Sequence, residues 1–549
     1  MRAKAYLEQR LQQIIQDWGY SWPDKAQVEQ PRQEGLGDMA SNLALVLASK
    51  AGKKPRELAQ EISSQILAQP GEVQSVQVAG PGFLNFTLRT SFWQAAVPRV
   101  LEQGSLYGSS DLGQKQKVLI EYVSANPTGP LHIGHGRGAA VGDSLVRILD
   151  YSGYEAQSEY YVNDAGRQMS ILGQSVWVRY QQLCGHEIRF SGELYQGEYI
   201  LDLARELYRL RGLGLLQLDR EEAIKVCREH ALQGILSGIR QDLQEFRVQH
   251  QSWFQESSLQ DVLPGTLQGL EDSGLAYEQE GALWFRSTAF GDDKDRVLRK
   301  SDGELTYFAA DIAYHAQKFS RGFDWLVDVW GADHHGYIPR MKAAIQALGR
   351  QPQELQVLLI QLVNLLRAGE QVTMSTRAGE FVTLAQVCQE VGVDAARFIF
   401  LSRKSDSSLD FDLELLKTQS MENPVYYVQY AHARICSVLR KAQEAGLQEG
   451  AFEDRISALL NTEDDLEQLK ALEQFPGTVQ AAARTLSPHH ISYYLLDLAG
   501  KLHRYYNRQQ ILNMQQPEQS RARLLLVRAV AQVLQNGLAL LGVQAPQEM

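Results

Sequence analysis

The apolar run Val118–Val123 passes directly into a loop with two prolines, residues 124–130, and then into a helical pattern that carries Val141, Leu145 and Ile148. A buried strand followed by a loop and a helix is typical of open α/β sheets, whose parallel strands are covered by helices. Similar runs at 325–330 and 357–363 also precede a glycine-bearing loop and a helix. These units predict a domain built on a parallel sheet.

The 549 residues exceed what one core accommodates, so we expect several domains. Residues 1–112 have helical patterns followed by two strand patterns, which indicates an α+β domain. The α/β domain is expected over 113–409, with a mostly helical, polar insertion at about 173–302, and residues 410–549 predict an all-α bundle. Outside the α/β domain we expect helices at 3–18, 38–50, 55–67, 421–441, 465–472, 488–512 and 521–541, and strands at 73–78 and 83–88.

The composition says more about where the protein is located than about its activity. The four cysteines are scattered and form no C-x-x-C pair, so we expect neither a disulfide framework nor a local zinc site, and a cytoplasmic location. The start of the chain has no apolar signal segment, and no apolar run approaches membrane-spanning length, so no membrane association is expected. A net charge of −11 does not exclude RNA binding, because basic side chains can gather on one face.

The tetrad His132-Ile133-Gly134-His135 lies where the loop after the first strand becomes a helix. Ligands bind at the carboxyl ends of strands in such sheets, and a helix N-terminus attracts phosphate. Two imidazoles spaced i, i+3 share a face, from which either could donate a hydrogen bond to a phosphate oxygen. The alternative is a pair of incidental histidines, but the strand before the tetrad and the helix after it favour a nucleotide site.

The stretch from Glu121 to His135 resembles the HIGH signature of class I aminoacyl-tRNA synthetases in the form typical of arginyl-tRNA synthetases. Residues 161–166, 253–259, 307–315 and 329–337 resemble further segments of the same family. Residues 37–42 and 80–85 are similar to its N-terminal tRNA-binding domain, and 393–398 resembles the DALR stretch that precedes its anticodon-binding bundle. The resemblance covers the whole chain and implies a Rossmann-like catalytic domain.

The family's activity is an acyl transfer in two steps. The arginine carboxylate attacks the α-phosphorus of ATP, and a ribose hydroxyl of the terminal tRNA adenosine then captures the adenylate. The resemblance therefore implies L-arginine, ATP with Mg²⁺ as a substrate complex, and tRNA(Arg) as partners, with no protein-bound zinc and a monomeric enzyme. Two alternatives remain open: a class I synthetase for another amino acid, and a catalytically inactive paralogue that binds tRNA.

Arginine carries a guanidinium with five donors, so a selective pocket should be acidic. The resemblance assigns guanidinium binding to Tyr307, Asp311 and Glu256, and the α-groups of the amino acid to Glu121 and Asn126. Without the motif, a helix carboxylate such as Asp311 is most often solvated, and a tyrosine in an apolar stretch most often serves packing.

ATP contact is expected at the tetrad and at the ends of two later strands. The ATP-binding residues are predicted to be Pro127, His132, Gly134, His135, Gly331, Asp333, His334, Met374, Ser375 and Thr376. The last three lie where the family has its second signature, KMSKS, but threonine stands at both lysine positions here. Arg377 is the remaining cation of that segment, so the predicted catalytic residues are His132, His135 and Arg377, with an exposed loop charge as the alternative for Arg377.

Binding of tRNA is predicted at two distant places. Asn85 falls in the N-terminal segment that resembles the family, and Tyr427, Tyr430 and Arg434 interleave aromatic rings with a cation along one helix of the bundle. Such side chains can stack on unpaired bases. An aromatic stripe packed inside the bundle is at least as common an explanation for any one of them.

Overall fold

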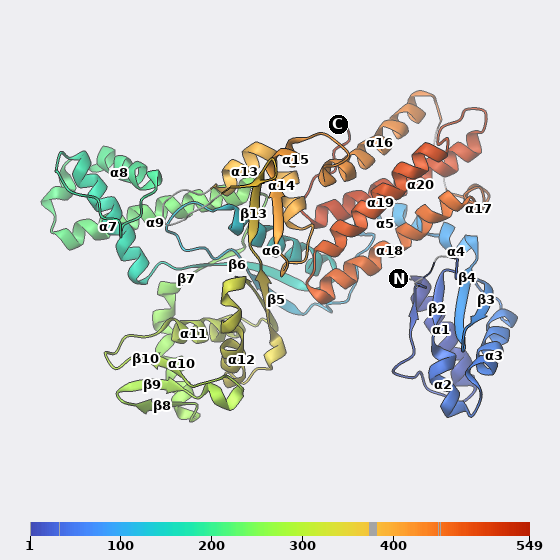
Figure 1. The fold of residues 1–549 in the computed structure, drawn as a ribbon, viewed down its shortest axis with the longest axis horizontal. Coiled ribbons are helices and arrows are strands. Elements are labelled where there is room, and N and C mark those ends of the chain that lie inside the picture. The colour runs from blue at the N-terminus through green and yellow to red at the C-terminus, as the bar shows by residue number, and fades with distance from the viewer. Residues whose placement is uncertain (1, 32, 34, 373–381, 448–449, 451) are drawn as a thin grey trace.

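The computed structural model describes residues 2–31, 33, 35–372, 382–447, 450 and 452–549 (Figure 1). At its centre is a five-stranded sheet in the order β12-β11-β5-β6-β7, in which every neighbouring pair is parallel. The predicted α/β class with a parallel sheet is therefore confirmed. The strands are β5 (Lys117–Glu121), β6 (Glu155–Val162), β7 (Ser252–Gln255), β11 (Trp325–Gly331) and β12 (Leu355–Ile360).

Helix α6 (Ile133–Tyr151) follows β5 and packs closely on the sheet. Its residues are buried over most of the length, which explains why its apolar pattern is nearly continuous. The approach is close enough that a Cβ added to Gly142 would lie 2.1 Å from the ring of Tyr122. The glycine therefore sets the distance between the helix and the end of β5.

The stretch 173–302, expected as a mostly helical insertion, contains strands as well as helices. Three long helices, α7 to α9, project from the sheet, but β7 then joins the main sheet beside β6, and a small antiparallel sheet β10-β9-β8 follows. These strands have only four residues each, too few for a pattern to stand out. The elements are α7 (Gly166–Leu183), α8 (Glu198–Arg211), η2 (Gly214–Gln217), α9 (Arg220–Glu245), η3 (Glu256–Asp261), α10 (Leu263–Asp272), β8 (Ala276–Gln279), β9 (Ala282–Phe285), η4 (Ser287–Phe290) and β10 (Arg296–Arg299).

The α/β region is completed by helices on the sheet and by a second small sheet, β14-β13-β15. Strand β15 pairs in parallel with β13, so it extends this region to residue 412. The elements are α11 (Tyr307–Ser320), η5 (Ala332–Tyr337), α12 (Ile338–Ala347), η6 (Pro352–Glu354), β13 (Val363–Arg367), β14 (Glu370–Gln371), α13 (Leu384–Val391), α14 (Val393–Phe400), β15 (Leu409–Asp412) and α15 (Leu413–Lys417).

The N-terminal domain is a four-stranded sheet, β1-β2-β4-β3, contacted by three helices. One predicted helix, 38–50, begins instead with strand β2, because Met39 and Ser41 alternate inward and the strand pairs with both β1 and β4. The elements are α1 (Arg2–Asp17), β1 (Val28–Glu29), β2 (Met39–Ser41), α2 (Leu43–Ala51), α3 (Pro55–Ala68), β3 (Val73–Ala79) and β4 (Phe83–Leu88).

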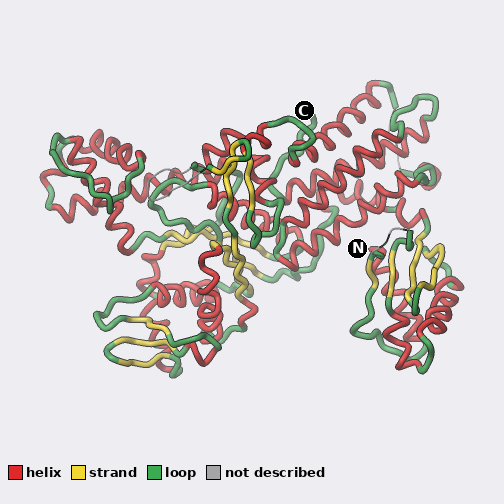
Figure 2. The backbone as a smooth tube through the Cα atoms, viewed as in Figure 1, coloured by secondary structure: helices red, strands yellow, loops and turns green. Residues whose placement is uncertain are grey.

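The end of the chain forms the predicted helical bundle, and Figure 2 shows it as a group of long helices. Two helices from the start of the chain, α4 and α5, contact α18, and α5 also contacts α20. Gln94 and Tyr107 each donate a side-chain hydrogen bond to a bundle carbonyl, at 2.9 Å. The elements are α4 (Thr90–Gln94), α5 (Ala96–Gln103), η1 (Gly104–Leu106), α16 (Pro424–Glu444), α17 (Asp454–Ser457), α18 (Glu463–Thr485), α19 (His489–Arg508) and α20 (Pro517–Leu540).

Candidate active site

A cavity of about 910 Å³ opens at the carboxyl ends of β5, β11 and β12. Three segments far apart in sequence line it: the loop and first turn after β5, the turn after β11, and the end of β12. Most residues predicted to contact ATP are brought together here, while Pro127 is buried in the adjoining loop. The predicted residues in the lining are Asn126, His132, Gly134, His135, Gly331, Asp333 and His334.

The two histidines of the tetrad stack with ring centroids 3.6 Å apart. His132 caps α6: its Nδ1 accepts the Gly134 N–H at 3.1 Å, and the Nδ1 of His135 accepts the His132 N–H at 3.2 Å. Burial lowers the pKa of His132, and burial together with the neighbouring ring lowers the pKa of His135 to about 3. Both rings are therefore neutral at pH 7 with the proton on Nε2, which makes each a hydrogen-bond donor without a net charge.

Three predicted arginine-binding carboxylates surround one tyrosine beside this cavity. Burial, followed by the charges of Glu256, Asp311 and Glu121, raises the pKa of the Tyr161 hydroxyl. Burial is also the main cause of a raised pKa in each of the three carboxyls. Neighbouring carboxylates add to the rise, whereas the charge of Lys318 lowers the pKa of Glu121 and Asp311. The pocket thus concentrates negative charge that a bound cation would stabilise.

Asp311 lies in the first turns of α11, and its carboxylate accepts a hydrogen bond from the hydroxyl of Tyr337. Tyr337 comes from the turn after β11 and therefore joins the acidic pocket to the predicted ATP side. Tyr307, one helical turn before Asp311, is 66% exposed and is therefore not packed in the core, as a tyrosine in an apolar stretch usually is. Its exposure leaves the ring available to a ligand.

The carboxylate of Glu121 is paired with a buried lysine. Lys318 Nζ donates to Glu121 Oε2 at 2.6 Å and to Asp328 Oδ1 at 2.9 Å, and Asp328 also contacts His315 at 2.9 Å. The charges of Lys318 and His315 hold the pKa of Asp328 well below its usual range despite burial. Since Ser124 donates to the other oxygen of Glu121, this carboxylate has a fixed orientation at the end of β5.

Glu256 is positioned by the segment that follows β6. With its amide oriented to donate, Asn163 reaches Glu256 Oε2 at 3.1 Å and lies 3.3 Å from the amide of Asn126. The next residue, Asp164, accepts from the backbone N–H and the hydroxyl of Ser257 at 2.9 and 2.6 Å. Two predicted residues from different chain segments, Glu256 and Asn126, therefore meet through Asn163.

The predicted tRNA-binding residues lie on two separate surfaces. Asn85 is only 5% exposed, and its amide nitrogen has no partner among the described residues, while Phe83 on the same face of β4 is 42% exposed. In the bundle the guanidinium of Arg434 lies 3.5 Å from the ring centre of Tyr506 and 6.0 Å from that of Tyr430.

Tyr430 also stacks on His503, and Tyr427 meets the same imidazole edge to face, so these tyrosines are half-buried. Tyr427 and Tyr430 therefore pack on His503 and are also partly exposed to solvent.

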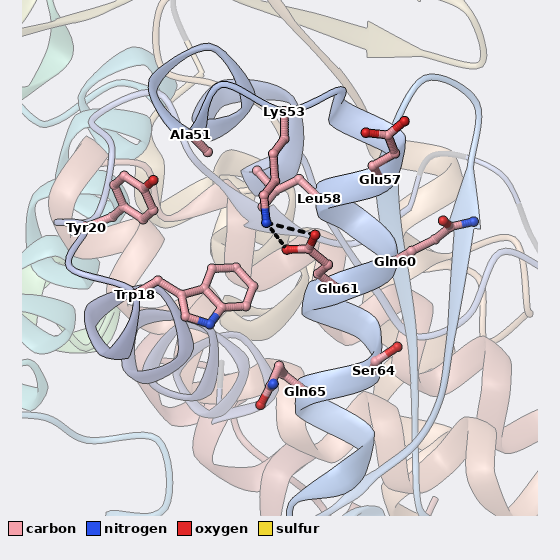
Figure 3. A pocket seen from close by; sticks show the side chains of 10 residues that line it. All are labelled: Trp18, Tyr20, Ala51, Lys53, Glu57, Leu58, Gln60, Glu61, Ser64 and Gln65. Carbon is pink, nitrogen blue, oxygen red and sulfur yellow. Dashed lines mark hydrogen bonds and ion pairs between the residues drawn. The ribbon is translucent and has the colours of Figure 1, made fainter.

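Four predicted residues of the second signature, Met374, Ser375, Thr376 and Arg377, lie outside the described residues. Elsewhere in the described chain, no group of three His, Cys, Asp or Glu side chains is arranged to hold a metal, and no helix there is long and apolar enough to cross a membrane. A second hollow of about 730 Å³ lies on the N-terminal domain between Trp18, Tyr20 and helix α3 (Figure 3). Lys53, the basic side chain labelled in Figure 3, is already paired with Glu61.

Several site residues were not assigned a role by sequence reasoning: Tyr161, Asn163, Lys318, Asp328 and Tyr337. Tyr161, Asn163 and Tyr337 lie in segments that resemble the family, but their functions depend on contacts across the sheet. Lys318 follows Asp311 by seven residues on the same helix, a spacing that places both on one face. That spacing is the one signal that could have indicated Lys318.

Comparison with known proteins gives a consistent result along the whole chain. Family models described as "Arginyl tRNA synthetase N terminal domain", "tRNA synthetases class I (R), catalytic domain" and "DALR anticodon binding domain" match residues 3–88, 96–412 and 428–549. Relatives named arginine–tRNA ligase from Nitratidesulfovibrio vulgaris and Solidesulfovibrio magneticus are 58% and 55% identical, each over 552 residues and 100% of both chains.

Solved structures agree on the fold. An arginyl-tRNA synthetase from Thermus thermophilus has a TM-score of 0.76 with 24% identity over 100% of both chains. A methionyl-tRNA synthetase from Mycobacterium tuberculosis has a TM-score of 0.51 with 13% identity, over 77% of this chain and 91% of its own.

Proposed function

The chain belongs to the arginyl-tRNA synthetase family, and we propose how its residues carry out that family's reaction, the ATP-dependent ligation of arginine to tRNA. The observation that supports this most directly is the adjacency of two subsites. A pocket with three carboxylates adjoins a cavity that carries two neutral, stacked histidines. An amino acid with a cationic side chain and a nucleotide can therefore occupy neighbouring places.

Arginine binds with its guanidinium toward Asp311 and Glu256, with Tyr307 over it, and with its α-groups near Asn126. Glu121 contributes negative charge from the end of β5, where Lys318 fixes its direction. A planar guanidinium paired with carboxylates forms strong, directional hydrogen bonds, and the raised carboxyl pKa values fall when the cation binds. The selectivity for arginine over neutral amino acids follows from this charge.

ATP binds as its Mg²⁺ complex in the cavity, with adenosine beside Gly331, Asp333 and His334 and phosphates at the start of α6. The Nε2–H groups of His132 and His135 donate to phosphate oxygens as the arginine carboxylate attacks the α-phosphorus and pyrophosphate leaves. Preorganised neutral donors stabilise developing charge without any reorganisation. A ribose hydroxyl of tRNA then attacks the adenylate carbonyl, and AMP leaves.

Binding of tRNA uses both ends of the chain. The unpartnered amide of Asn85 beside exposed Phe83 is suited to one unstacked base, and the cluster of Tyr427, Tyr430 and Arg434 is suited to bases of the anticodon. The enzyme acts as a monomer in the cytoplasm. Four free cysteines support a reducing compartment.

The test is aminoacylation of total tRNA with each of the twenty amino acids, labelled one at a time. Arginine alone should be attached. Attachment of another amino acid instead would contradict the acidic pocket as the specificity site, and tRNA binding without attachment of any amino acid would identify an inactive paralogue.

A further inference from the structure

The loop between β5 and α6 is anchored by two tyrosine hydroxyls from outside it. Tyr160, in β6, donates to the carbonyl oxygen of Ala125 at 2.8 Å, and Tyr199 donates to the carbonyl oxygen of Thr128 at 2.5 Å. Between these two anchors lie Asn126, which is exposed, and Pro127, which is buried. The backbone that carries Asn126 is therefore held on both sides of this residue.

The two anchors come from different parts of the molecule. Tyr160 belongs to the central sheet, and its 0% exposure makes it a fixed point of the core. Tyr199 lies in the first turn of α8, in the group of helices α7 to α9 that projects from the sheet (Figure 1). The Tyr199 hydroxyl donates the hydrogen bond that links α8 to this loop.

The ring of Tyr199 also contacts the loop directly. A Cβ added at Gly129 would lie 3.1 Å from Cζ and from the hydroxyl oxygen of Tyr199, closer than side chains usually approach. The backbone of Gly129 does not require positive φ, so the absence of a side chain there matches the ring above it rather than a turn. Thr128 in turn donates its N–H to the carbonyl of Asn126 at 2.7 Å, which passes the constraint to that residue.

We propose that Tyr199 is a positioning residue for Asn126, so that the affinity of the site for arginine depends on where the α7–α9 helices sit. This inference rests on the proposed role of Asn126 in binding arginine. A side chain held in its binding geometry loses less conformational freedom when the ligand arrives, so the anchor lowers the cost of binding rather than the barrier of the chemical step.

The test compares steady-state aminoacylation by wild type and Tyr199→Phe, a change that removes one oxygen and keeps the ring. One hydrogen bond contributes about 1 kcal/mol, so KM for arginine should rise about fivefold while kcat changes less than twofold. A loss of folded enzyme would instead lower kcat at constant KM. Tyr208→Phe, on the same helix with its ring against Tyr180, is the matched control and should keep both constants.

A second variant tests the contact itself. Gly129→Ala places a methyl group against the Tyr199 ring and hydroxyl and should also raise KM for arginine, but its effect should be smaller in the Tyr199→Phe background, where the bond is already absent. Unchanged KM in Tyr199→Phe, or fully additive effects, would overturn the inference while leaving the proposed function intact. Unchanged KM in Asn126→Ala would overturn the role of Asn126 and this inference with it. Wild type without arginine attachment would overturn the proposed function.

Discussion

Asp311 and Tyr337 illustrate what single residues would contribute to the proposed selectivity for arginine. The carboxylate lies in a pocket whose other ionisable groups are mostly acidic, and the tyrosine hydroxyl donates to it. Burial raises the pKa of Asp311, so ionisation of this group opposes folding of the free enzyme. The same charge favours binding of a cation. Affinity for substrate and stability of the empty protein are therefore opposed at this position.

Asp311→Asn tests this opposition. Removing a desolvated partner of a guanidinium costs on the order of 2–5 kcal/mol, so kcat/KM for arginine should fall at least about thirtyfold, while KM for ATP should stay near wild type. Because the folded-state pKa is raised, the folded protein binds the proton more tightly, and stability is lost as pH rises through the interval between the unfolded and folded pKa.

The variant should therefore unfold at a higher temperature than wild type at pH 7 and at nearly the same temperature at acidic pH. Differential scanning calorimetry at two pH values measures this. An unchanged arginine KM together with unchanged kcat/KM would show that Asp311 is not in the pocket that selects arginine.

The stacked histidines predict a pH profile. Burial and the neighbouring ring bring the pKa of His135 to about 3, so this ring does not titrate between pH 6 and 8, and burial lowers the pKa of His132 in the same direction. The rate of arginine activation at saturating substrates should therefore show no limb from His135 in that range. The measurement is pyrophosphate exchange with tRNA present, for wild type and for His135→Asn. A limb near pH 6.5 that disappears in the variant would contradict neutral donors.

Arg377 carries a prediction from sequence alone, since threonine stands at both lysine positions of the second signature. If its guanidinium supplies the missing charge, Arg377→Ala should slow arginine activation by on the order of 3 kcal/mol, or about a hundredfold. Arg367, already paired with Glu390 and Glu414, is the control, and Arg367→Ala should not slow activation. Equal exchange rates for Arg377→Ala and wild type would place the compensating charge elsewhere.

At the scale of elements, helix α6 has two faces with different tasks. Gly142 faces the sheet at close range, whereas a Cβ added at Gly138 would meet no atom within 4 Å, because Gly138 lines the cavity. The sequence predicted the strand, the loop and this helix, because each has a local pattern. The sequence does not reveal which glycine packs on the sheet and which lines the cavity, because that depends on Tyr122 and on the far wall of the cavity.

Matched alanine substitutions separate these tasks. Gly142→Ala forces helix and sheet apart and should destabilise the protein by about 1–3 kcal/mol, as overpacking does, with KM for ATP unchanged in the folded fraction. Gly138→Ala should leave stability equal or higher and raise KM for ATP, since the methyl projects into the cavity. Urea unfolding and ATP titration of both variants decide the matter. If Gly138→Ala destabilised the protein and Gly142→Ala raised KM for ATP, the two assigned roles would be wrong.

Other elements were not predicted from the sequence for the same physical reason. Strand β7 and strands β8 to β10 are short, and they are stabilised by neighbours that no local pattern encodes. Strand β2 occupies part of a predicted helix because pairing on both sides outweighs local preference. In the site, paired residues such as Asn163 with Glu256 directly follow strands that are adjacent in space but about 90 residues apart in the chain.

At the scale of the whole molecule, the N-terminal domain and the α7–α9 helices lie at opposite ends, with the parallel sheet and the bundle between them (Figure 1). Helices α4 and α5 pack on the bundle, although both lie within the predicted N-terminal domain of residues 1–112. Asn536 of α20 donates to the carbonyls of Gly104 and Tyr107, which fastens the following turn as well.

Two truncations test this boundary. Removal of residues 1–88 leaves α4 and α5 on the bundle and should give a folded enzyme that activates arginine but has a raised KM for tRNA. Removal of 1–112 also strips Trp93, Val97 and Val100 from the bundle and should lower its resistance to urea. Circular dichroism and aminoacylation distinguish the two. Equal stability of both truncations would place α5 outside the bundle core.

The packing of α5 on α18 and α20 has a consequence for synthesis on the ribosome. The N-terminal sheet is complete by residue 88, but α5 must wait for residue 540 before its partners exist. At about 5–20 residues per second, that delay is roughly 20–90 seconds. Throughout it, the apolar side chains of α5 lie on a nascent chain without their complete cover. This short segment is where a chaperone that binds nascent chains would have the longest opportunity to act.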